Sequence, residues 1–145
     1  MPAFSGTFSG TIEVQSGAIV GDNAGHELSL ALVRGPQQCS DDKWNGATIT
    51  YTAVLDLTDG KGTQRGYFVN LHVDGDSDYG MFDGVVASVG DEIVCQGTWE
   101  STGGTGRYRG ITGKGKFRMV MPTPKTVRTT WDGAYELASA KAHAS

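Results

Sequence analysis

Several residue types that mark common functional classes are scarce in this sequence. Its 145 residues include two cysteines, four prolines and three histidines. Cys39 and Cys95 are too few for a disulfide framework and show no CxxC spacing, so two reduced thiols are expected, with a bridge between them as the alternative. Histidines this far apart in the sequence give no zinc signature. The lack of a GxSxG motif, and of a base beside either cysteine, disfavours nucleophilic catalysis.

Strong charge and long apolar runs are also missing. Twelve basic and sixteen acidic residues give a formal net charge of −4, and the acids are scattered, so nucleic acid is not an expected partner. No segment approaches the about 18 apolar residues of a spanning helix. The first residues, MPAFSGTFSG, lack a basic region followed by an apolar run. We therefore expect no membrane association and a cytoplasmic location.

Glycine, in contrast, is abundant. There are 22 glycines, and segments rich in Thr, Val, Tyr and Phe alternate with turn signals, while helix signals are nearly absent before Ala138. The pattern predicts an all-β protein in one domain, residues 1–137, followed by a short tail at 138–145. The expected strands are eight: 4–14, 26–34, 47–57, 67–73, 79–88, 92–101, 114–121 and 127–137.

The most informative stretch is 97–118, GTWESTGGTGRYRGITGKGKFR. Its glycines allow the chain to leave one strand and enter its neighbour, which is the arrangement of a barrel corner. Arg107, Tyr108 and Ile111 lie between the glycines and are expected to form a short turn that plugs the barrel end. The spacing GxGxxxG departs from the GxGxxG of dinucleotide-binding loops, which disfavours phosphate binding.

This stretch, together with DGKGTQRGY at 59–67 and DGD at 74–76, resembles the allene oxide cyclase and dirigent barrel superfamily, and small bacterial members of it most closely. The resemblance implies a small closed antiparallel barrel that forms homo-oligomers and takes an apolar small molecule into its lumen. Cyclisation and stereochemical control are the tasks known in the superfamily. The catalytic residues of the plant cyclase do not align by motif onto this sequence, so the resemblance does not imply which task applies.

Strand alternation gives two readings of the segment 67–74. One face carries Tyr67, Val69, Leu71 and Val73, and the other carries Phe68, Asn70, His72 and Asp74. In a purely structural barrel the first face points inward and the second faces water. In a functional barrel Phe68, Asn70 and His72 line the lumen, and an oligomer interface covers the apolar face. A β-bulge would invert the assignment beyond it.

Four residues are candidates for chemistry. His72 is the first choice as a general acid or base, and His26, at the expected barrel mouth, is the second. Asn70 and Tyr79 could stabilise charge on a substrate oxygen. Each also has an ordinary structural reading, as a surface or packing residue. The residues expected to contact the substrate are the aromatic ones: Phe68, Tyr51, Phe82 and Trp99.

No metal site or cofactor is expected. Asp74, Asp76 and Asp78 alternate like the start of a calcium loop, but Tyr79 and Val85 stand where Gly and Glu would be needed, so a solvated turn is the simpler interpretation.

The sequence thus favours a cofactor-independent isomerase, cyclase or lyase acting on a hydrophobic small molecule. The alternative is a non-catalytic, lipocalin-like or dirigent-like binding protein. A third reading is a barrel filled by its own aromatic side chains, such as Phe8, Phe82, Trp99 and Phe117. Free space in the lumen decides between a filled and a hollow barrel.

Overall fold

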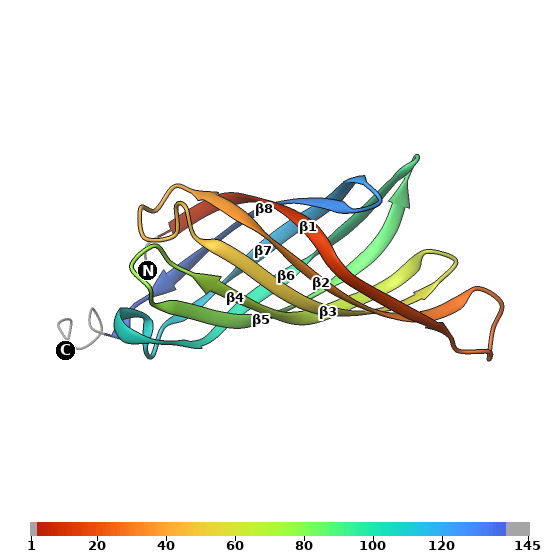
Figure 1. Cartoon of the computed structure of the whole chain (residues 1–145), viewed down its shortest axis with the longest axis horizontal. Coiled ribbons are helices and arrows are strands. Elements are labelled where there is room, and N and C mark those ends of the chain that lie inside the picture. The colour runs from red at the N-terminus through yellow and green to blue at the C-terminus, as the bar shows by residue number, and fades with distance from the viewer. Residues whose placement is uncertain (1–2, 139–145) are drawn as a thin grey trace.

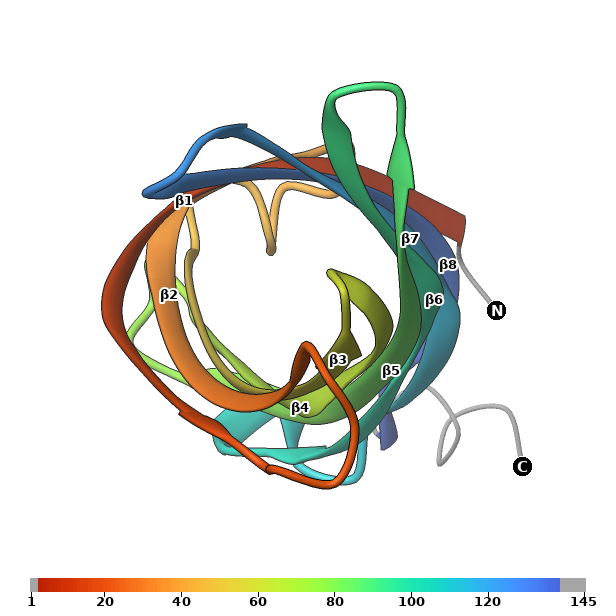
Figure 2. The same cartoon turned by 90° about the vertical axis from the view of Figure 1, so that its right-hand side faces the viewer.

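Eight long strands follow one another around a ring, each antiparallel to the next (Figures 1 and 2). The computed structural model describes residues 3–138, and β8 pairs with β1 to close the ring. The all-β fold and the closed eight-stranded barrel predicted from the sequence are confirmed. The elements are β1 (Ala3–Ile19), β2 (His26–Cys39), β3 (Thr48–Thr58), β4 (Lys61–Leu71), β5 (Ser77–Val89), β6 (Glu92–Gly104), a 3₁₀ turn η1 (Gly106–Tyr108), β7 (Thr112–Thr123) and β8 (Thr126–Glu136).

Six of the strands are longer than alternation predicted, whereas β3 and β8 have the predicted length and are each shifted by one residue. β1 and β2 stay paired from Gly6 opposite Cys39 to Ile19 opposite Glu27, so the loop expected to begin at Gly35 begins after Cys39. The prediction of a loop start there was wrong because a glycine and a proline were taken as a stop. Both residues pair with β3, and the pairing with β1 resumes at Gln37. Of the predicted tail, 138–145, Ala138 alone lies within the described residues. Within residues 3–138 no helix has the length and apolar character needed to cross a membrane.

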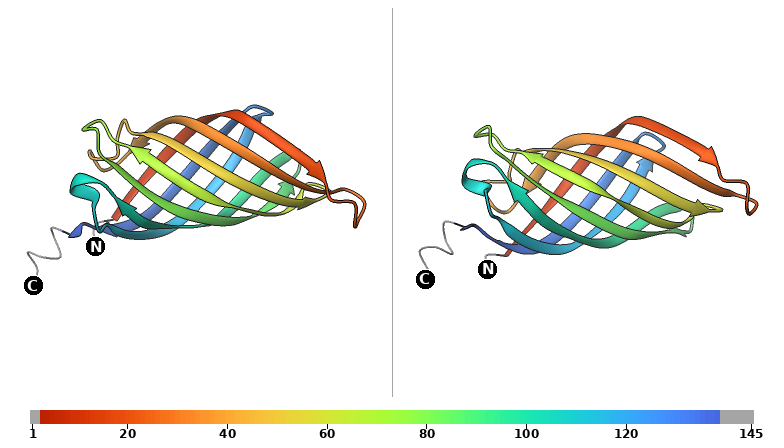
Figure 3. Two further views of the ribbon diagram at one scale, coloured as in Figure 1. Left: turned by 60° about the horizontal axis from the view of Figure 1, so that its bottom comes forward. Right: turned by 90° about the horizontal axis from the view of Figure 1, so that it is seen from below.

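The two ends of the barrel differ in construction (Figures 1 and 3). One end carries the connections 40–47, 72–76 and 105–111, and the other carries the connection 20–25 and three two-residue turns. Asp59 and Gly60 form the hairpin turn between β3 and β4, and both residues have positive φ (53° and 78°), as a two-residue turn between twisted strands requires. The glycine-rich corner forms η1, so the predicted short turn is also confirmed.

Two clusters of buried side chains fill the interior. The first lies in the middle of the barrel around Phe8, Val33, Tyr51 and Met119. The second, which we call the plug, closes the end with the connections 40–47, 72–76 and 105–111 and consists of Phe4, Trp44, Tyr108, Ile111 and Tyr135. The large rings fit because glycines lie beneath them: a side chain at Gly80 would strike Phe68, and one at Gly115 or Gly133 would strike Trp99.

Candidate binding cavity in the barrel lumen

A cavity of about 100 Å³, measured as the space open to the centre of a water molecule, lies in the lumen between the two clusters. Its wall is mainly aromatic, with polar side chains from β2, β4 and β5 among the rings. The aromatic lining residues are Phe4, Phe8, Trp44, Tyr51, Phe68, Phe82, Trp99, Phe117 and Trp131. The lumen is therefore partly filled by aromatic side chains and partly open.

The four aromatic residues expected from the sequence to contact a substrate, Tyr51, Phe68, Phe82 and Trp99, all line this cavity. They come from β3, β4, β5 and β6, so the barrel brings together residues from four consecutive strands. The Tyr51 hydroxyl donates to the Met119 sulfur at 3.6 Å. Burial raises the pKa of Tyr51 well above its usual range, so this hydroxyl stays neutral and acts as a hydrogen-bond donor.

His72 is buried beside the lumen, with a side chain that is 0% exposed. Its Nδ1 is 2.8 Å from the backbone oxygen of Lys43, which can only accept, so Nδ1 carries a hydrogen and donates it. Its Nε2 is 2.5 Å from Oδ1 of Asp78. The ring also stacks on Tyr108 with centroids 4.0 Å apart. Because both nitrogens are engaged, neither is free to meet a molecule in the cavity.

Asp78 connects His72 to the lumen. Its Oδ1 contacts His72, its Oδ2 accepts a hydrogen bond of 3.1 Å from Asn70 Nδ2, and the residue is 2% exposed. Asp78 and Asn70 both line the cavity. The inward face of β4 is therefore the one with Phe68 and Asn70, as in the second of the two readings. His72 follows the end of β4 and is not among the residues that line the cavity. A carboxylate held by an imidazole and an amide is the strongest polar feature of the wall.

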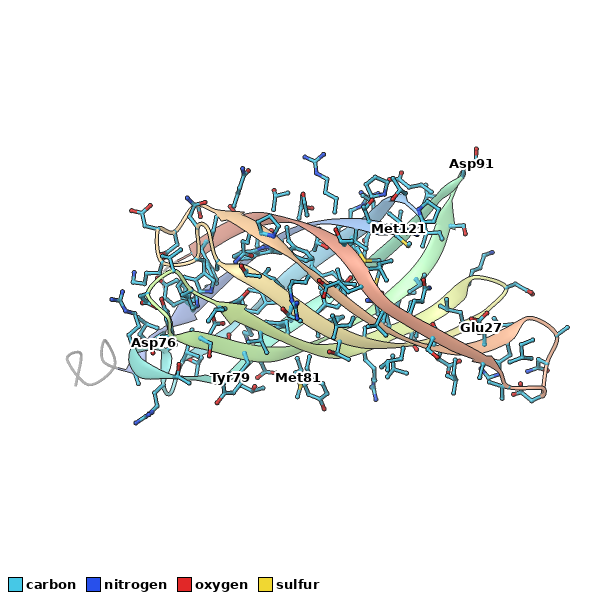
Figure 4. The ribbon with its side chains drawn as sticks, viewed as in Figure 1. Glu27, Asp76, Tyr79, Met81, Asp91 and Met121 are labelled. Carbon is cyan, nitrogen blue, oxygen red and sulfur yellow. The ribbon has the colours of Figure 1, made fainter. Side chains whose placement is uncertain are left out.

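The structure does not bring the other two candidate residues to this site. Tyr79 lies on the outer face of β5, 40% exposed, and Figure 4 shows it beside Met81, pointing away from the barrel. His26 lies at the opposite end, where its nitrogens are 2.6 Å from Asp22 and 2.7 Å from Asp56. Alternation alone explains the position of Tyr79, because Asp78 and Gly80 on either side of it point inward.

A hydrogen bond to a carboxylate also holds the plug in place. The Tyr135 hydroxyl donates to Oδ2 of Asp41 at 2.5 Å. Burial opposes ionisation of Asp41, but the hydrogen bonds from Tyr135 and from the backbone of Lys43 outweigh it and lower its pKa. Burial, together with the nearby charge of Asp74, raises the pKa of Tyr108 to about 12. The plug is thus a neutral, largely aromatic layer, and the Asp41 carboxylate binds it through Tyr135.

Sequence reasoning missed Asp78 because it was grouped with Asp74 and Asp76 as part of a solvated turn. Two of the three carboxylates do meet other loop residues: Asp74 pairs with Arg107 at 3.2 Å, and Asp76 accepts from Thr105 at 3.4 Å. Asp78 instead belongs to β5. The signal was present, since Phe82 was placed in the lumen and Asp78, four residues earlier, shares its face.

Further lining residues that the sequence did not single out for the site include Gln37, Gln64, Trp44 and Trp131. Gln64 could have been found by alternation from Phe68. Trp44 could not, because it sits in a loop whose path depends on contacts with His72, which follows β4, and with Tyr135 of β8.

The chain was also compared with known proteins. Neither the models of protein families nor the curated proteins gave a match. Function is therefore inferred from the chemistry of the cavity: an aromatic wall, a buried carboxylate bound to His72 and Asn70, and an end closed by the plug.

Proposed function

We propose that the protein binds an apolar small molecule in the barrel lumen. The observation that supports this most directly is the aromatic-lined cavity of about 100 Å³. A cavity of about 150 Å³ with apolar walls is known to take a single benzene ring, so a ring-sized ligand is the right scale. The resemblance to the allene oxide cyclase and dirigent superfamily agrees with this reading. Two free thiols in a chain without a disulfide framework support a cytoplasmic location.

A matched pair of substitutions tests binding. Thr129 lines the cavity and its neighbour Thr130 faces outward. The Thr129→Met substitution fills part of the lumen and should weaken binding of a ring-sized probe such as toluene by about tenfold or more, whereas Thr130→Met should leave it unchanged. Chemical-shift titration in heteronuclear NMR spectra measures both. Equal binding by the two variants, or no binding by the wild type, would contradict the proposal.

The cavity supports binding better than catalysis, because His72, the expected general base, has no free nitrogen. A second candidate function, cofactor-independent proton transfer in an isomerase, cyclase or lyase, is favoured by Asp78, whose carboxylate lines the cavity. In this reaction Asp78 takes a proton from a carbon next to a carbonyl group and returns it to another position, so no other reactant is needed. Asn70 would orient the carboxylate through its 3.1 Å hydrogen bond.

Proton transfer can be tested without knowing the natural substrate. Exchange of the α-hydrogens of cyclohexanone with D₂O, followed by NMR, should be faster with the wild type and fall at least tenfold in Asp78→Asn. Asp83→Asn, on the outer face of β5, is the control. An exchange rate equal to that in buffer would exclude the second function while leaving binding intact.

We also propose that the protein is a homo-oligomer whose subunits meet through the outer face of β4 and β5. This face exposes a continuous apolar set, with Tyr67 67% exposed. Tyr67 pairs with Met81 and Val69 with Tyr79 across the two strands. The remaining members of the set are Leu71 and Val73.

A second copy of the chain is the occupant that fits. The closed ring of strands leaves no edge for β-pairing, so association must use side chains on an outer face. In a two-fold contact the same patch of each subunit meets its copy, so the patch must be complementary to itself. An apolar patch meets this condition without any charge pairing. Size-exclusion chromatography with light scattering should give a multiple of 15.3 kDa. Tyr67→Glu should reduce it to the monomer and Thr130→Glu should not. A monomeric wild type would overturn the proposal.

A further inference from the structure

Five buried polar atoms of the lumen have no hydrogen-bond partner within residues 3–138. They belong to four residues, and all four line the cavity. Buried polar groups in proteins are nearly always paired, so a set of unpaired atoms around one cavity indicates that a bound molecule supplies the partners. The atoms are Gln37 Nε2, Gln37 Oε1, Gln64 Oε1, Asn70 Oδ1 and Trp131 Nε1.

Gln37 carries the clearest signal. It is 2% exposed, both polar atoms of its amide are unpaired, and its backbone is fixed by hydrogen bonds with Ala47 and Gly46. Gly35, two residues before Gln37 on β2, pairs with Ile49 of β3, and Ile49 pairs with Asn70 of β4. The Gln37 and Asn70 side chains therefore lie in the same part of the wall. This part lies next to the plug.

The unpaired atoms specify hydrogen-bonding groups on the ligand. Asn70 Nδ2 donates to Asp78, so its free Oδ1 can only accept and needs a donor. Trp131 Nε1 can only donate and needs an acceptor. Gln37 offers one of each. A hydroxyl or primary amide group, which both donates and accepts, matches this set, and a purely hydrocarbon ligand leaves all of it unpaired.

The charge of the wall restricts the ligand further. Among the described residues that line the cavity there is neither lysine nor arginine, so an anion has no counterion there. The Asp78 carboxylate on the same wall repels a second carboxylate. A cation would have to compete with His72 and Asn70, which already contact both oxygens of the Asp78 carboxyl group.

From these observations, and resting on lumen binding as proposed above, we propose that the cavity selects a neutral ligand with a hydroxyl or amide group on an apolar ring-sized body. The polar group lies against Gln37 and Asn70 near the plug. The apolar body lies against Phe82, Phe117 and Tyr51, which line the cavity on the strands around the lumen.

Isosteric probes test the ligand class. Benzyl alcohol and ethylbenzene have the same shape and differ by a hydroxyl in place of a methyl group, and benzoate adds the charged case. Isothermal titration calorimetry gives the ratio of the two neutral dissociation constants for the wild type and for Gln37→Met, which removes both unpaired atoms while keeping the volume. Gln38→Met, on the outward-facing neighbour, is the matched control.

We expect Gln37→Met to shift this ratio about tenfold toward ethylbenzene, as loss of a hydrogen bond to a buried group does, and Gln38→Met to leave it unchanged. In the absence of any ligand, Gln37→Met should raise Tm, because a buried unpaired amide is removed.

An unchanged ratio, a lower Tm in Gln37→Met, or tightest binding of benzoate would overturn the ligand class while toluene binding stands. Failure of every probe, toluene included, would overturn lumen binding itself.

Discussion

His26 holds a carboxylate with each of its ring nitrogens and so ties the β1–β2 turn to β3 through Asp22 and Asp56. The hydrogen bond to Asp22, followed by that to Asp56, raises the pKa of His26 above 6.5. The same contact with His26 lowers the pKa of Asp22 below 3.8. Protonated His26 is thus favoured by the folded state, and so is ionised Asp22.

This contact predicts a stability that depends on pH. The contribution of His26 is complete below pH 6.5 and is lost as the pH rises through its folded pKa, while that of Asp22 is lost as the pH falls below 3.8. Because the groups are at the surface, His26→Gln should lower Tm by about 1–3 °C at pH 5.5 and by less at pH 8.5. Differential scanning calorimetry measures this, and a difference that is the same at both pH values would contradict it.

At the scale of the strand, glycines decide where two strands can approach each other. Gly97 of β6 lies opposite Gly84 of β5, and a β-carbon at Gly97 would collide with the backbone oxygen of Asp83. Backbone cannot move aside as a flexible side chain can. At Gly17 of β1 the nearest atom is the carboxylate end of Glu27, which can rotate away.

Gly97→Ala should therefore destabilise the protein by about 1–3 kcal/mol or more, the range for overpacking. Gly17→Ala, in the outer part of a strand, should stay within about 0.5 kcal/mol of the wild type. Urea unfolding followed by tryptophan fluorescence gives both free energies. Similar values for the two variants would show that backbone crowding at Gly97 is relieved by a shift of β5.

Strand patterns also explain how much of the fold and site the sequence could predict. Alternation and turn residues predicted the number of strands, because each strand has its own local signal. The choice of inward face on β4 could not be made that way, since Tyr67 and Val69 are more apolar than Asn70 and His72. The polar face points inward because Asp78, on another strand, and Lys43, in a loop, satisfy it.

The candidate site shows the same limit. The aromatic lining residues were predicted by type, and all four are in the lumen. His72 was predicted as a base from its titration range, but its role depends on what its nitrogens contact, and those contacts span 29 residues to Lys43 and 6 to Asp78. Partners that lie in other elements leave no trace in the periodicity of one strand.

For the whole molecule, closure of the barrel means that no strand can separate without breaking pairing on both sides. The reactivity of Cys95 can be used to detect opening of the barrel. It is 0% exposed on the inner side of β6, and burial raises the pKa of its thiol to about 11. Cys39, at the end of β2, is partly exposed, and burial raises its pKa as well. Both are free thiols, so the alternative of a disulfide between them is not realised.

Labelling with a thiol reagent should therefore follow opening of the whole barrel. In Cys39→Ser protein, Cys95 should react only on unfolding, because thiolate is the reactive species and a thiol with a pKa near 11 in a closed core forms little of it. When reclosing is fast compared with labelling, the labelling rate gives a free energy of opening. This free energy should equal the free energy of unfolding measured in urea. Rapid labelling of Cys95 in native buffer, at a rate insensitive to low urea, would instead reveal local opening of the barrel next to the cavity. That result would identify a route by which a ligand enters the lumen without global unfolding.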